Sequence, residues 1–158
     1  MYIGYMGDIV FAVSAYHMLT PTKFEREASG RWAEHNLLLR KPVSQFGGPG
    51  LEKLSFSIIL DDDHGIDPAS QLKKLRKMRD MGAVFPLVIG GRPVAQNSWR
   101  LDSLKEGDCY WTVDGQLQQC IVQITLTEYE EGNQTEEKAI TLSYGSNNGA
   151  ESSVLGGD

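Results

Sequence analysis

Cysteine and long apolar runs are both scarce in this chain. Its 158 residues include two cysteines, and 41% of the residues are hydrophobic. It lacks a run of about 18 apolar residues, which a membrane-spanning helix needs. The apolar start MYIGYMGDIVFAVSAY has no basic segment and carries Asp8 early, so it predicts a first strand rather than a signal peptide. We therefore expect a protein made in the cytoplasm without a membrane contact.

Residue patterns that carry chemistry are missing as well. The three histidines share no metal-ligand spacing, and neither a nucleophile elbow nor a phosphate-binding loop is present. Asp61, Asp62 and Asp63 are consecutive, whereas a calcium loop needs acids at alternate positions, so they predict a solvated turn. The glycine-rich residues 47–50 also predict a turn. We predict no catalytic, metal-binding or cofactor-binding residue and no cofactor.

The net charge of −6 is concentrated near the C-terminus. Residues 130–158 contain six acids and one base, which is −5 and leaves −1 for the first 129 residues. This near-neutrality argues against nucleic-acid binding, which needs an excess of bases, and fits a surface that docks with proteins. The composition predicts one domain at 1–129 and an acidic, polar, flexible extension at 130–158. Within the extension, residues 138–144 are a candidate for one more strand or for a segment that pairs with a neighbouring subunit.

Most apolar residues alternate with polar ones, as is typical of half-buried strands. The clearest set is Leu54, Phe56, Ile58 and Leu60. Gly90-Gly91 predicts a two-residue hairpin turn. Further strands are expected at about 8–14 with a short strand before it, 24–28 (with helix as the rival), 31–39, 85–89, 92–95, from residue 99 onward, and 122–126. The predicted fold class is α+β, mostly antiparallel β with one main helix at about 67–81.

The helix at about 67–81 is well delimited. Asp67 is a plausible N-cap, Pro68 suits the first helical position, and Gly82 suits the C-terminal end. Its apolar stripe consists of Leu72, Leu75 and Met78. The remaining surface carries the basic residues Lys73, Lys74, Arg76, Lys77 and Arg79. These five are either a solvated face or a candidate protein interface; nucleic-acid binding is a weaker alternative, because no aromatic residues interleave with them.

The last predicted hairpin brings the two cysteines together. Asp114-Gly115 favours a two-residue type I′ turn, in which Val113 faces Gln116. In that register Cys109 faces Cys120, since opposed residue numbers sum to 229. A disulfide is sterically allowed, but two reduced, packed thiols are favoured in a cytosolic chain.

Several stretches, in order, resemble the tail protein U (GpU-like) family of contractile-tailed phages and phage-tail-like particles. They are GYMGDIVFAVS at 4–14, FEREASGRWAEHNLL at 24–38, KPVSQFGGPGLEKLSFSIIL at 41–60, LKKLRKMRDMG at 72–82, PLVIGGRPV at 86–94, Trp99, and ITLTEY at 124–129. The resemblance covers about residues 2–129. Its matching positions are interpreted as fold residues: Gly7, Arg31, Trp32, Gly50, Pro86, Gly90 and Gly91.

The resemblance implies a structural tail protein rather than an enzyme, acting in tail assembly near the baseplate hub and tube end. It implies a split β-barrel or sandwich similar to tail-tube proteins, and a symmetric ring of six copies in the virion tail. The implied partners are the chain itself, the tail tube, the hub or spike, a LysM-type tail protein and the sheath-initiating layer. A tail terminator at the head-proximal end is the alternative within this class. A small ligand-binding or hydrolytic β domain is the alternative from another class, since distant acids can converge in space.

Overall fold

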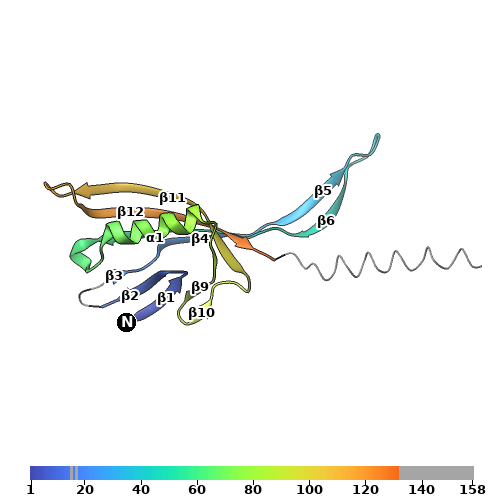
Figure 1. The fold of residues 1–158 in the computed structure, drawn as a ribbon. Coiled ribbons are helices and arrows are strands. Elements are labelled where there is room, and N and C mark those ends of the chain that lie inside the picture. The colour runs from blue at the N-terminus through green and yellow to red at the C-terminus, as the bar shows by residue number, and fades with distance from the viewer. Residues whose placement is uncertain (15, 17, 132–158) are drawn as a thin grey trace, which may run out of the picture.

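The computed structural model describes residues 1–14, 16 and 18–131. It shows the predicted α+β fold, which is mostly antiparallel β with one α-helix (Figure 1). The predicted extension at 130–158, with its candidate strand at 138–144, lies outside the described residues except for its first two positions.

The first sheet is made of short strands in the order β10-β9-β1-β2-β3. Their bounds are Tyr2–Met6 for β1, Ile9–Val13 for β2, Met18–Leu19 for β3, Leu87–Ile89 for β9 and Arg92–Pro93 for β10. Gly4 is required where β1 approaches β9, because a Cβ there would lie 1.9 Å from the carbonyl oxygen of Val88. The predicted pair of strands at the N-terminus is thus confirmed.

The second sheet has the order β4-β7-β12-β11-β8 and contains the longest strands. Their bounds are Thr22–Glu27 for β4, Lys53–Asp61 for β7, Val84–Phe85 for β8, Ser98–Trp111 for β11 and Leu117–Tyr129 for β12. The predicted inward face of β7 is confirmed, because Leu54, Phe56, Ile58 and Leu60 are all buried. β12 pairs with β7 from Gln119 opposite Asp61 to Thr127 opposite Lys53.

The predicted strand 85–89 is divided between the two sheets. Pro86 separates β8, which pairs with β11, from β9, which pairs with β1. Proline has no N–H to donate to a ladder, so the chain changes sheets at this residue. The two-residue turn at Gly90-Gly91 is confirmed, with positive φ at both glycines and Arg92 opposite Ile89.

Helix α1 spans Pro68–Asp80 and follows a short 3-10 helix, η1, at Asp62–His64. Its predicted stripe Leu72, Leu75 and Met78 is buried. Asp67 occupies the N-cap position, but its side chain makes no capping hydrogen bond. At the other end Ala83 N–H donates to the Met78 carbonyl, 3.0 Å, and Gly82 has φ +61, as in a Schellman motif.

The core lies between the two sheets and under the helix. Phe11 of β2 meets Phe56 of β7 edge to face, with ring centroids 6.2 Å apart. The helix stripe and the inner faces of β7 and β12 belong to the same buried cluster. In the described residues both five-stranded sheets stay open, so the two sheets do not join into a closed barrel.

A two-stranded arm, β5–β6, projects from the body (Figure 1). β5 is Gly30–His35 and β6 is Val43–Pro49, so the predicted strand 31–39 ends four residues early. The turn predicted at residues 47–50 is wrong as well. Residues 47–49 belong to β6, with Gly48 at φ +99 and Gly30 opposite Pro49, and Gly50 N–H donates to the Ser29 carbonyl, 2.7 Å. The direction of the chain reverses instead at Leu38-Leu39.

The β11–β12 hairpin is confirmed, but its turn is one residue longer than predicted. Thr112 N–H donates to the Gln116 carbonyl, 2.8 Å, and residues 113–115 form the loop with Gly115 at φ +80. Trp111 therefore faces Leu117. A bulge between Gly107 and Tyr110, with Asp108 at φ +48, absorbs a further residue, so Cys109 and Asp108 together oppose Cys120.

Candidate interaction surfaces

The described residues hold no group of three His, Cys, Asp or Glu side chains that could bind a metal ion. Asp62, Asp63 and His64 are exposed in η1, and His64 Nδ1 lies 3.2 Å from Asp61 Oδ2. His35 Nε2 lies 3.0 Å from Gln45 Oε1 on the arm, far along the chain from His64. The structure does not bring these histidines together; His17 lies outside the described residues.

The two cysteines are free thiols that lie close together. Each sulfur lies 3.7 Å from the Gly107 carbonyl oxygen, which both thiols approach as donors. Burial, helped by the neighbouring Cys109, raises the pKa of Cys120 to about 12. A thiol with such a pKa is protonated at neutral pH and is a poor nucleophile. The pair is therefore part of the packing.

All five predicted interface residues of α1 are exposed, but they are not equivalent. Arg76 donates from Nε and Nη2 to both carboxylate oxygens of Glu106 on β11, 2.9 and 2.8 Å. The hydrogen bonds to Glu106 also raise the pKa of Arg76. Arg79 pairs with Asp80, 2.9 Å. Within the described part of the chain no carboxylate lies within 4.0 Å of the three lysines, Lys73, Lys74 and Lys77.

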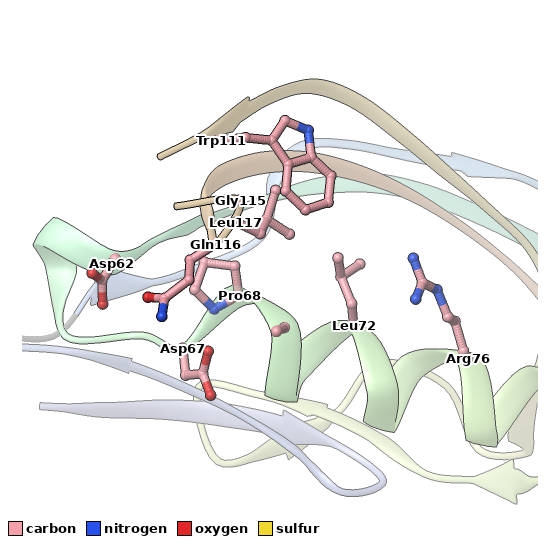
Figure 2. Close-up of a pocket in the computed structure, with 10 residues that line it drawn as sticks. Asp62, Asp67, Pro68, Leu72, Arg76, Trp111, Gly115, Gln116 and Leu117 are labelled. Atoms are coloured by element: carbon pink, nitrogen blue, oxygen red, sulfur yellow. The ribbon is translucent and has the colours of Figure 1, made fainter. Parts of the chain in front are cut away.

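A groove of about 500 Å³ separates the first half of α1 from the end of the β11–β12 hairpin. Trp111 and Leu117 project from the hairpin toward Pro68 and Leu72 of the helix, as Figure 2 shows. Asp62 and Asp67 lie at the end where the helix begins, and Arg76 lies at the other end (Figure 2). The groove thus combines apolar side chains with an acidic end and a basic end.

The arm exposes an unusual amount of apolar surface. Trp32 and Phe46 pack on each other across the ribbon, with ring centroids 4.9 Å apart, yet both are more than half exposed. At the tip Leu38 is 91% exposed and Leu39 is 97% exposed. Exposed apolar side chains gathered on a projecting element mark a surface for another protein.

Sequence reasoning missed both the arm and the groove. The arm left one signal, the run NLLLRKP at 36–42, in which three leucines stand between polar residues without a helical or strand period. The groove left none, because its walls come from residues more than 30 positions apart.

Together these features define a small α+β protein whose exposed surfaces suit assembly with other proteins. No helix in the described part of the chain is long and apolar enough to cross a membrane. A search of curated proteins returned no match. The family model described as Phage P2 GpU matches residues 7–131, and the chain therefore belongs to the GpU family.

Membership identifies a structural phage tail protein. It places the protein in the virion tail, in contact with other tail components. The match includes the arm, the helix and both sheets, so these elements fall within the part of the chain that the family model describes.

Proposed function

We propose that this protein acts in tail assembly near the baseplate hub and tube end, as part of a symmetric ring of six copies. Two observations support the proposal. The chain belongs to a tail-protein family, and its β5–β6 arm leaves apolar side chains exposed in the single chain. A lone two-stranded ribbon is marginally stable in water. Packing against a neighbouring copy removes its apolar residues from water.

The partners in this proposal are further copies of the chain, the tail tube, the hub or spike, a LysM-type tail protein and the sheath-initiating layer. The proposal gives the protein no nucleic-acid or membrane contact. Residues 1–129 act as one tail-protein domain of α+β type, and 130–158 is an extension of it. The protein is made in the host cytoplasm and works without a cofactor or catalytic residue.

The basic face of α1 is a proposed contact with a neighbouring tail component. Its lysines Lys73, Lys74 and Lys77 are the residues that carry this contact, because Arg76 and Arg79 already pair within the chain. Exposed cations with no carboxylate within 4.0 Å among residues 1–14, 16 and 18–131 attract an acidic partner surface and steer its approach.

Reversing the charge of Lys73, Lys74 and Lys77 to glutamate tests this contact. We expect a folded chain, since these side chains are exposed, and a loss of tail yield in complementation of a tail-deficient particle. Arg92→Glu/Lys53→Glu, two exposed cations on β10 and β7, serves as the control for charge alone. Unchanged tail yield in the triple variant would remove the helix face from the proposal.

A tail terminator at the head-proximal end is the second candidate, because ring-forming surfaces serve either end of a tube. Labelling the chain with an antibody against an exposed tag and viewing intact tails separates the two. Label at the baseplate end supports the first proposal, and label at the opposite end supports the second.

A further inference from the structure

The arm tip, residues 37–41, combines exposed apolar side chains with basic ones. Leu37, Leu38 and Leu39 are exposed, and Arg40 and Lys41 follow them directly. Leu39 also has φ +58, a backbone conformation that costs energy for a leucine. The tip therefore presents three exposed leucine side chains with two cations beside them, at the far end of the β5–β6 arm.

The groove between α1 and the hairpin has the complementary chemistry. Trp111 and Leu117 give it apolar side chains on the hairpin side, and Leu72 lies buried on the helix side. Asp62 and Asp67 give it an acidic end, and Arg76 lies at the other end. Its volume of about 500 Å³ lies in the range of sites that bind drug-sized groups, which is enough for leucine side chains.

The two surfaces lie at opposite ends of the molecule (Figure 1). From Gly30 to His35 the strand β5 extends about 16 Å, at about 3.3 Å per residue, away from the groove. A chain's arm consequently points away from its own groove, so its tip is available to another copy. Contact between two different surfaces of identical copies is head to tail, and such contacts generate rings when the rotation closes.

We propose that the arm tip of one copy docks in the groove of the next copy, with the leucines between Leu72 and Leu117 and the cations at Asp62 and Asp67. This contact rests on the proposed ring and specifies how neighbouring copies hold one another.

Sedimentation velocity and light scattering of the purified full chain test the contact. Leu38→Ser/Leu39→Ser removes two of the exposed leucines of the tip, and Asp62→Lys/Asp67→Lys reverses the charge at the acidic end of the groove. We expect each variant to raise the apparent dissociation constant for self-association by at least about tenfold, or 1.4 kcal/mol. Arg92→Glu/Lys53→Glu should associate like the wild type. Circular dichroism checks that each variant is folded. The groove variant changes Asp67 at the start of α1, whereas the leucine variant changes only exposed residues of the arm tip, so its result does not depend on an effect on α1.

Mixing the two variants gives the sharper result. The tip variant keeps an intact groove and the groove variant keeps an intact tip, so an equimolar mixture should form two-copy complexes at a concentration where each variant alone is monomeric. Arg40→Glu/Lys41→Glu combined with Asp62→Lys/Asp67→Lys in one chain should restore association. An oligomer that persists in both single variants would overturn the contact and keep the ring. A wild-type chain that stays monomeric throughout would overturn both.

Discussion

Replacing Phe56 with alanine is expected to destabilise the protein by about 3–5 kcal/mol. The side chain is 1% exposed and lies between two other aromatic rings. Phe11 meets it edge to face at 6.2 Å, and Phe24 stacks on it at 6.0 Å with an interplanar angle of 18°. Truncation removes the buried ring from both contacts and leaves a cavity between the sheets, which relaxes only in part.

Urea unfolding followed by tryptophan fluorescence measures this loss, because Trp99 is fully buried and changes environment on unfolding. At about 2–4 °C per kcal/mol for a chain of this size, a loss of about 4 kcal/mol lowers the melting temperature by about 8–16 °C. Phe46→Ala is the matched control, since that ring is 55% exposed and contacts Trp32 on the arm, so its loss is at most about 1.5 kcal/mol. Equal effects of the two substitutions would refute the assignment of Phe56 to the core between the sheets.

Three further predictions follow from backbone contact, ion pairing and titration. Gly4→Ala should destabilise by about 3 kcal/mol in urea unfolding, because its Cβ would overlap the carbonyl oxygen of Val88 and part β1 from β9; a loss near zero would contradict this packing. A double-mutant cycle at Arg76 and Glu106 should give a coupling free energy below about 1 kcal/mol that falls with added salt, since the side chains are 50% and 28% exposed; a larger, salt-independent value would contradict surface screening. The pKa of Cys120 rises on folding from 9.0 to about 12, so between these values the unfolded thiol loses its proton first and the free energy of unfolding falls as pH rises. Cys120→Ala should remove that slope when unfolding is measured across pH 8.5–10.5, and an unchanged slope would assign it to other groups.

The elements that the sequence predicted best are those with one buried face. Alternation marks β7 and β12, where every second side chain enters the core, and the caps around α1 mark its ends within one residue. Local sequence patterns were sufficient there, because the buried positions and the helix-capping residues indicate the same elements.

Local sequence patterns did not predict the β5–β6 arm or the length of the β11–β12 turn. β5 and β6 expose both faces, so no alternation distinguishes them from loop. Residues 47–50 look like a turn, although 47–49 belong to β6, which pairs with β5. At residues 113–115 one added residue changes the register, and Asp114-Gly115 suits both loop lengths. The groove depends on the first half of α1 lying beside the end of the β11–β12 hairpin, which no short stretch encodes.

The family itself was predicted correctly from the sequence, and with it the class of structural tail protein. The candidate interface on α1 was specified by residue type alone. Only the structure distinguishes Arg76, whose guanidinium is held by Glu106, from the three lysines beside it. Charge counting along a helix cannot show which cations already have a partner.

A reconstruction of the whole tail particle would give the position and the neighbours of every copy. We predict a closed ring of copies around the tail axis near the baseplate hub, with the β5–β6 arm of each copy against the next. Particles in which the chain is absent from the tail, or present as copies that do not touch one another, would contradict it.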